Sequence, residues 1–265
     1  MLLANKVAVI HGAGGSIGGA VARAFGREGA KVFLAGRTLA KVEAVARDIT
    51  RAGGRAEAAQ VDALDEHAVN GYVTDVVAKT GRLDVTLNAV GLFHVQGTPF
   101  AELSLEDFTY PLAIYTRTNF LTAKAAARHM VKQGSGVVLT LSTPGSRMSG
   151  VGFLGYGVTC GAIETFTRIL AGELGQSGVR AVCLRSDAIP ETLATSHARR
   201  VFHGFAERAG VKVEDMLAER ARVGTLLQRF PTLAQVANFA AFVASDGAGA
   251  MTGAIANLTC GSVVD

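Results

Sequence analysis

Short apolar segments alternate with longer amphipathic stretches along almost the whole chain. The first apolar run, residues 6–11, ends at Gly12 and is typical of a buried parallel strand. Ile17, Val21 and Phe25 follow at helical spacing and predict a helix over residues 17–27. Further strands are predicted at 32–35, 56–61, 85–87, 137–141, 179–184 and 254–258, and further helices at 39–49, 66–79, 105–132, 153–176 and 233–245.

This alternation predicts the fold class. Strands that alternate with helices of ten or more residues form right-handed βαβ units around a parallel sheet. We therefore expect a single-domain α/β fold over residues 1–265: a Rossmann-like, doubly wound parallel sheet of about seven strands with helices on both faces. Residues from about 190 to 224 are polar and helical without a strand, so we expect an excursion from the sheet that acts as a substrate lid.

Composition narrows the class of protein. Hydrophobic residues make up 49% and charged residues 18%, enough apolar material to bury both faces of a sheet. The net charge of +4 includes no lysine or arginine block, which argues against nucleic-acid binding. No apolar run approaches the ~18 residues of a membrane span. Three cysteines without CxxC or metal-ligand spacing predict no metal site and a reduced, cytoplasmic chain.

A glycine-rich segment, residues 11–19 (HGAGGSIGG), joins the first strand to the first helix. A turn at this place directs free backbone N–H groups and the positive end of a helix toward a pyrophosphate. Glycines permit the sharp turn and the close approach of phosphate. A glycine cluster alone indicates only a tight turn, but its position between a strand and a helix favours a dinucleotide site.

The end of the second strand bears on the choice of cofactor. An acidic residue there binds the ribose 2′-hydroxyl of NAD, whereas an arginine accommodates the 2′-phosphate of NADP. This chain has Arg37 and no acidic residue at that place. The sequence therefore favours NADP(H) over NAD(H), although a solvated arginine at a helix start is the alternative.

Motifs over nearly the whole length resemble the short-chain dehydrogenase/reductase family. The glycine-rich segment is similar to Thr-Gly-x-x-x-Gly-x-Gly, with His11 in the threonine position and Ser16 in the middle-glycine position. Val61-Asp62 resembles the adenine-contacting aspartate, and residues 87–91 (LNAVG) resemble Asn-Asn-Ala-Gly. The resemblance implies the following cofactor-binding residues: Gly12, Gly14, Ser16, Ile17, Gly18, Arg37, Asp62, Ala63, Asn88 and Ala89.

The same resemblance implies a catalytic group in which one position is changed. Tyr156 stands where the family has its proton-transferring tyrosine, and Asn119 resembles the helix asparagine. Thr143, thirteen residues before Tyr156, takes the serine position; the adjacent Ser142 ranks second because neighbouring side chains on an extended chain point oppositely. Cys160, four residues after Tyr156, takes the lysine position. A neutral thiol cannot supply the positive field that lowers the tyrosine pKa.

Other residues are candidates to replace the charge of the missing lysine or to line a substrate pocket. Lys124, Arg147 and Arg185 are candidate substitute cations by sequence neighbourhood alone, each also explained as an ordinary surface or loop residue. Asp187 stands where the family has a small neutral residue that faces the nicotinamide. His129, His197 and His203 have no ligand spacing and are assigned no chemistry. Candidates for an apolar substrate pocket, or for plain packing, are Phe93, Met148, Phe153, Leu193, Phe202 and Phe205.

Taken together, the resemblance implies an NADP(H)-dependent oxidoreductase that acts on a carbonyl or secondary alcohol of a small-molecule substrate, with altered proton-transfer machinery. The alternative is a catalytically silent nucleotide-binding relative with a regulatory or assembly role, because the lysine is missing. The resemblance also implies a homotetramer or homodimer, with the helices at 105–132 and 153–176 as interfaces.

Overall fold

Seven parallel strands form one sheet in the order β3-β2-β1-β4-β5-β6-β7. The computed structural model describes all 265 residues. The arrangement confirms the predicted α/β fold with a doubly wound parallel sheet of about seven strands. The strands are β1 (Val7–His11), β2 (Lys31–Gly36), β3 (Arg55–Gln60), β4 (Val85–Asn88), β5 (Gly136–Ser142), β6 (Val179–Ser186) and β7 (Ile255–Leu258).

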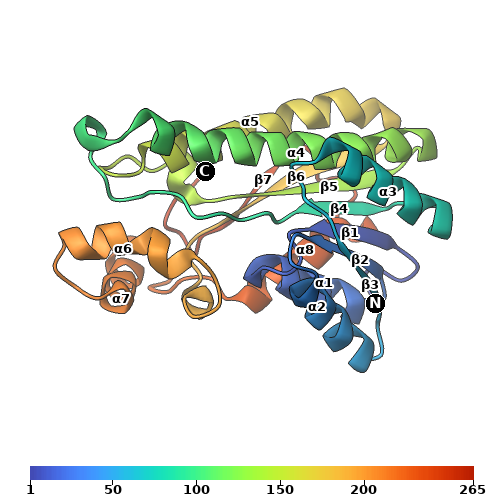
Figure 1. Cartoon of the computed structure of the whole chain (residues 1–265), viewed down its shortest axis with the longest axis horizontal. Helices are drawn as coiled ribbons and strands as arrows, with labels where there is room; N and C mark the ends of the chain where they lie inside the picture. Colours follow the sequence, from blue (N-terminus) through green and yellow to red (C-terminus); the bar gives the residue numbers. More distant parts are fainter.

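Helices cover both faces of the sheet, as Figure 1 shows. On one face lie α1 (Ser16–Arg27), α2 (Leu39–Arg51) and α8 (Leu233–Ala244). On the other face lie α3 (Glu66–Thr80), α4 (Leu105–Gln133) and α5 (Leu154–Leu174). Within β1, Ala8 and Ile10 pack toward the first group while Val7 and Val9 pack toward the second, so the strand is apolar on both faces up to His11.

Local signals account for where the helices begin and end. The Asp65 carboxylate accepts hydrogen bonds from the N–H groups of His67 and Ala68 and so caps the start of α3. Gly81 ends that helix in the left-handed conformation, at φ 76°. Thr232 and Gln235 form a reciprocal capping box at the start of α8.

Two helices leave the sheet between β6 and α8: α6 (Ala198–Arg208) and α7 (Val213–Gly224). They contain no strand, as the sequence predicted, and pack around a small apolar cluster that includes Leu217 and Phe230. In Figure 1 they lie to one side of the sheet, in orange. Helix α6 contacts the loop after β4 directly: a Cβ on Gly204 would lie 2.3 Å from the carbonyl oxygen of Gln96.

The strand order reverses beside β1, which pairs with β2 on one side and β4 on the other. In open α/β sheets this reversal leaves a crevice at the carboxyl ends of the strands, where ligands bind. The glycine-rich segment, the loop after β4 and the loop after β6 all begin at this edge. None of the helices is both long and apolar enough to cross a membrane.

Candidate active site

The glycine-rich segment forms a tight turn that tolerates no side chain at two positions. Gly12 has φ +76°, and a Cβ there would lie 2.5 Å from the carbonyl oxygen of Ala89. A Cβ on Gly18 would lie 2.5 Å from the carbonyl oxygen of Gly12. Helix α1 starts at Ser16 with no side-chain cap. Its first N–H groups therefore remain available, and the turn fits a pyrophosphate.

The end of β2, which precedes Arg37, lies close to this turn: a Cβ on Gly36 would lie 3.9 Å from Gly14 N. Arg37 follows β2 and is exposed, and its side chain takes part in no hydrogen bond or ion pair. Lys41, on the first turn of α2, packs against the glycine turn: a Cβ on Gly14 would meet the Lys41 Cβ at 2.9 Å. No sequence motif indicates Lys41, because only packing brings it to the turn.

Asp62 and Asn88, both predicted to contact the nucleotide, form hydrogen bonds within the loops that follow their strands. Asp62 accepts a hydrogen bond from Leu64 N at 3.0 Å and so shapes the loop after β3, in which Ala63 is buried. At the end of β4, Asn88 donates to Thr118 Oγ1 at 3.1 Å and accepts from Val90 N at 3.0 Å. These bonds fix the segment against which Gly12 packs.

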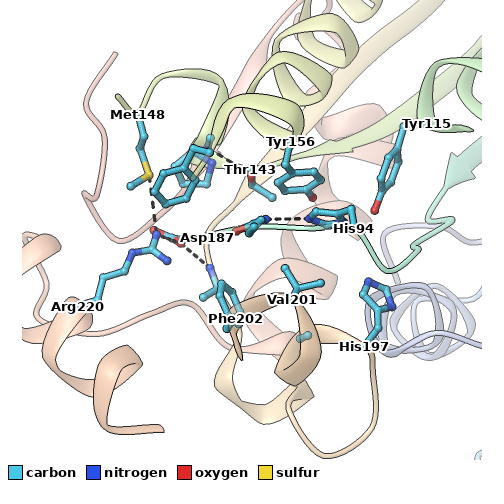
Figure 2. Close-up of a pocket in the computed structure, with 16 residues that line it drawn as sticks. His94, Tyr115, Thr143, Met148, Tyr156, Asp187, His197, Val201, Phe202 and Arg220 are labelled. Carbon is cyan, nitrogen blue, oxygen red and sulfur yellow. Dashed lines mark hydrogen bonds and ion pairs between the residues drawn. The ribbon is translucent and has the colours of Figure 1, made fainter. Parts of the chain in front are cut away.

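A cavity of about 140 Å³ lies between the β4 and β6 loops and helix α6. The β4 loop also joins the cavity to the glycine turn, because Gly12 packs on Ala89 while His94 and Gln96 line the cavity. Tyr156 and Thr143 both line it, so the structure brings together two of the predicted catalytic side chains. Figure 2 shows Tyr156 and His94 near one end, and Met148 and Arg220 at the other. The complete lining is His94, Gln96, Tyr115, Thr143, Pro144, Gly145, Met148, Phe153, Tyr156, Asp187, Ala188, His197, Ala198, Val201, Phe202 and Arg220.

An imidazole lies flat on the ring of Tyr156. The His94 and Tyr156 rings stack at 3.9 Å between centroids, with 17° between their planes. His94 Nδ1 lies 3.1 Å from the Leu92 carbonyl oxygen, to which it donates, and its Nε2 accepts from Gln96 Nε2 at 2.8 Å. Burial lowers the pKa of His94 to about 4, so the ring is neutral. It supplies no positive charge to Tyr156.

The thiol in the lysine position contacts the predicted serine-position residue. Cys160 is fully buried, and its Sγ lies 3.2 Å from Thr143 Oγ1. Burial raises the pKa of Cys160, so the group is a neutral thiol. Burial, followed by the proximity of Cys160 and Tyr115, also raises the pKa of Tyr156 well above its usual value. Tyr156 is therefore a protonated phenol without a cation beside it.

Asn119, the fourth predicted catalytic residue, is buried in α4. Its Nδ2 donates to the Tyr115 carbonyl oxygen at 2.9 Å, and its Oδ1 has no partner. The free oxygen is a buried acceptor on α4, the same helix that carries Tyr115.

The candidate substitute cations lie elsewhere. Lys124 pairs with Glu66 at 3.0 Å on the outside of α4. Arg185 is neither a surface nor a loop residue: it is 1% exposed within β6, and its guanidinium binds Glu164 at 2.8 and 2.9 Å and Asp265 at 2.6 Å. Neither Lys124, Arg147 nor Arg185 lines the cavity.

Glu164 organises the segment that carries Thr143. It accepts hydrogen bonds from Ser142 Oγ at 2.8 Å and Ser146 Oγ at 2.6 Å, in addition to those from Arg185. Although burial alone would raise the pKa of Glu164, these bonds hold it below the usual value. Ser142 thus turns away from the cavity and Thr143 toward it, as the alternation of an extended chain predicts.

Asp187 lies in the cavity wall after β6, where the sequence placed it. Its Oδ1 accepts from Arg220 Nη2 at 2.5 Å and from Ala188 N at 2.6 Å. Its Oδ2 is buried without a partner. Arg220 comes from α7, so an ion pair links the excursion to the sheet.

Of the predicted apolar pocket residues, Met148, Phe153 and Phe202 line the cavity. Phe205 packs on Phe153 at 4.7 Å, and Leu193 belongs to the core of the excursion. Phe93 lies at the surface under the guanidinium of Arg200.

Sequence reasoning missed several lining residues. His94, Gln96 and Tyr115 belong to a loop and a helix face without a readable motif. His197, to which no chemistry was assigned, also lines the cavity and lies against Gly91, where a Cβ would meet its Cε1 at 3.0 Å. The one sequence signal for these lining residues is the presence of Phe93 and His94 in the segment after β4.

Taken as a whole, the site can hold a phosphorylated nucleotide on the glycine turn and place a small molecule against two hydroxyl groups. The Tyr156 phenol and the Thr143 hydroxyl face one cavity beside that turn. Both hydroxyls can donate a hydrogen bond to a carbonyl oxygen.

Known proteins match this chain in sequence and in overall structure over almost its whole length. The family model described as enoyl-(acyl carrier protein) reductase matches residues 12–262. Tropinone reductase-like 2 of Erythroxylum coca is 33% identical over 93% of this chain and 86% of its own. Meso-2,3-butanediol dehydrogenase of Serratia marcescens is 34% identical over 94% and 91%. Among solved structures, NAD⁺-bound xylitol dehydrogenase superposes with a TM-score of 0.88 at 22% identity, covering 98% of this chain and 100% of that chain.

Proposed function

The chain belongs to the short-chain dehydrogenase/reductase family of nicotinamide-dependent oxidoreductases, and from this premise we propose that it is an NADP(H)-dependent enzyme that interconverts a carbonyl and a secondary alcohol. The observation that carries the proposal is the placement of Tyr156 and Thr143 on one cavity beside the glycine turn. Relatives named as a reductase-like protein and a dehydrogenase support the reaction type.

Thr143, Tyr156 and Cys160 have different roles in the proposed reaction. A bound nicotinamide supplies or accepts the hydride. Thr143 and Tyr156 hold the reacting oxygen by hydrogen bonds, and Tyr156 carries the proton that this oxygen gains or loses. Thr143 also contacts Cys160 Sγ, which fixes the orientation of its hydroxyl. The helices α6 and α7 act as a lid that excludes water from the cavity.

The missing lysine affects carbonyl reduction and alcohol oxidation to different extents. A phenol with a pKa well above its usual value is a weak proton donor, and its phenolate, the form that would accept a proton during alcohol oxidation, is scarcely populated at neutral pH. We therefore expect slow catalysis, with reduction of a carbonyl less impaired than oxidation of an alcohol at neutral pH. This is the altered proton-transfer machinery of the proposal.

NADP(H) is the proposed cofactor because two cations lie at the adenosine end of the turn without a carboxylate partner. Arg37 presents a guanidinium that can bind phosphate through two N–H groups. Lys41 lies on the first turn of α2, packed against Gly14. No acidic side chain stands at the end of β2 to bind a 2′-hydroxyl.

Isothermal calorimetry with NADPH and NADH tests the cofactor. We expect Arg37→Ala to weaken NADPH binding about tenfold or more, since a hydrogen bond to a charged group contributes about 1.5–3 kcal/mol, and to leave NADH binding nearly unchanged. Arg51→Ala removes an exposed arginine at the other end of α2 and serves as the matched control. Tighter binding of NADH than of NADPH by the parent protein would contradict the assignment.

Cys160 also favours a second candidate function, that of a nucleotide-binding relative without turnover. The only cation of the cavity wall, Arg220, is already paired with Asp187. A screen of ketones, diketones and quinones with NADPH separates the two functions. Binding of NADPH without oxidation of the cofactor by any carbonyl compound would favour the silent relative.

We also propose that the protein assembles as a homotetramer or homodimer through α4 and α5. Phe120 on α4 is 51% exposed and Ile169 on α5 is 59% exposed. Large apolar side chains that remain exposed on adjacent helices are typical of an interface.

A further inference from the structure

The Asp187–Arg220 pair is a charged group built into an otherwise largely apolar part of the cavity wall. The Asp187 side chain is 3% exposed and that of Arg220 is 25% exposed. Beside them lie Met148, whose sulfur is 4.0 Å from Arg220 Nη2, and Phe202. Figure 2 shows this pair at the end of the cavity opposite Tyr115.

Each member of the pair has hydrogen-bonding capacity that the protein does not use. Asp187 Oδ1 takes bonds from Arg220 and Ala188, but Oδ2 is buried with no donor. Arg220 donates to Asp187 and approaches Met148 through Nη2 alone, so its Nε and Nη1 find no acceptor in the chain. A buried acceptor without a donor is unfavourable by about 1–3 kcal/mol, which a ligand can relieve.

The charges decide which ligand group fits. The carboxylate and the guanidinium neutralise one another, so the pair as a whole attracts neither an anion nor a cation strongly. A carboxylate ligand would be repelled by Asp187, and an ammonium ligand by Arg220. A hydroxyl is neutral and can donate to the Asp187 carboxylate while it accepts from an Arg220 N–H.

We propose that Asp187 and Arg220 form a second polar subsite that binds a hydroxyl group of the substrate, separate from the oxygen held by Tyr156 and Thr143. The inference rests on the proposed reaction at that first oxygen. The substrate is then a hydroxyketone or the corresponding diol, with an apolar portion that packs on Met148 and Phe202. A cavity of about 140 Å³ accommodates a small molecule, since one of about 150 Å³ in another protein holds benzene.

The test uses two matched series: straight-chain 2-alkanones, and the same ketones with a terminal hydroxyl at increasing distance from the carbonyl. We expect the hydroxyl to raise kcat/KM at least tenfold at one chain length, where it spans the cavity, and to lower it at the others. A hydroxyl that never raises kcat/KM overturns the subsite.

Variants identify the side chain responsible. Asp187→Asn keeps the shape but removes the charge, and we expect the preference for the hydroxyketone over its parent ketone to fall severalfold or more. Asp215→Asn makes the same chemical change at an exposed position of α7, so we expect it to keep the preference of the parent protein. An unaltered preference in Asp187→Asn would overturn the assignment.

A binding measurement separates this inference from the proposed function. Calorimetry follows the binding of each hydroxyketone of the series to the parent protein and to Asp187→Asn, in the presence of NADPH or NADH, and the tightest binder to the parent is compared. If no ketone is reduced but the hydroxyketone binds the parent several times more tightly than the variant, the proposed function fails and the subsite stands. If ketones are reduced and both proteins bind the hydroxyketone equally, the function stands and the subsite fails.

Discussion

Tyr156 faces its cavity in an unusual electrostatic setting, with a neutral imidazole on its ring and a neutral thiol one helical turn away. Nothing in that setting favours the phenolate, because burial disfavours charge and no cation compensates for it. The family resemblance predicted a catalytic role for Tyr156, and its side chain lines the cavity. Cys160 and His94 together determine the electrostatic environment of Tyr156. No sequence motif indicates His94, so its position on the Tyr156 ring could not be predicted.

Cys160→Lys should restore a cation next to the phenol and speed the reduction of a diketone by NADPH. One pKa unit corresponds to about 1.4 kcal/mol, so lowering the Tyr156 pKa by ~2–3 units raises a rate limited by proton transfer by about 10²–10³-fold. Steady-state kinetics measures the gain, and thermal unfolding checks that the variant folds.

Cys160→Ala is the matched control for that experiment. It removes the thiol and its contact with Thr143 without adding charge, so it should show no gain in rate over the parent. A folded Cys160→Lys protein that binds NADPH and reduces no faster would argue against Tyr156 as the proton donor.

Sequence alternation was sufficient to choose between two neighbouring hydroxyls, because Ser142 and Thr143 must point to opposite sides of an extended chain. It was not sufficient for Arg185. Sequence neighbourhood suggested a loop or surface cation, whereas the structure buries this arginine against Glu164, twenty-one residues earlier. Such a pairing depends on how α5 lies on β6, which no local pattern encodes.

At the scale of elements, the buried ion pair between Glu164 and Arg185 joins α5 to β6 beneath the cavity. Removal of Arg185 leaves the Glu164 carboxylate buried without a cation, with only the hydroxyls of Ser142 and Ser146 as partners. We expect Arg185→Met to lower the free energy of unfolding by about 3–5 kcal/mol, measured by urea denaturation.

Two further variants test the cause of that loss. Glu164→Met combined with Arg185→Met removes both charges, and we expect it to be less destabilised than Arg185→Met alone. Arg222→Met breaks an exposed pair with Glu219 and should change stability by no more than about 1 kcal/mol. Equal losses in the single and double variants would show that packing, and not an uncompensated charge, is responsible.

Most element boundaries agreed to within one or two residues because the apolar periodicity and the end signals coincide. The third strand was predicted at 56–61 and runs from Arg55 to Gln60. The long helix predicted at 153–176 ends at Leu174, and a short 3-10 turn continues to Ser177. The end of an α-helix and a 3-10 turn have similar sequence patterns, so composition alone does not separate them.

For the whole molecule, the exposed apolar side chains on α4 and α5 predict self-association. Phe120→Glu combined with Ile169→Glu places charges on that surface and should dissociate the assembly toward monomers, measured by light scattering after size-exclusion chromatography. Val211→Glu changes an equally apolar residue, 47% exposed on the excursion, and should leave the assembly intact. A monomeric parent protein would contradict the proposed interface.

The overall fold was predictable because each βα unit repeats the same pattern, and the connection rules leave few topologies. How the excursion packs was not predictable. Its helical character could be read from polarity and periodicity, but its contacts with the β4 loop and with Asp187 join segments far apart in sequence.

One such contact joins Ser16 Oγ on the glycine turn to Thr195 Oγ1 at 3.0 Å, across 179 residues. During synthesis, the first of these side chains leaves the ribosome long before the second. Helix α8, made later still, packs against α1, the helix that the turn begins. The glycine turn therefore cannot complete its packing until both Thr195 and α8 have been made, so we expect a nucleotide to bind there only after that point.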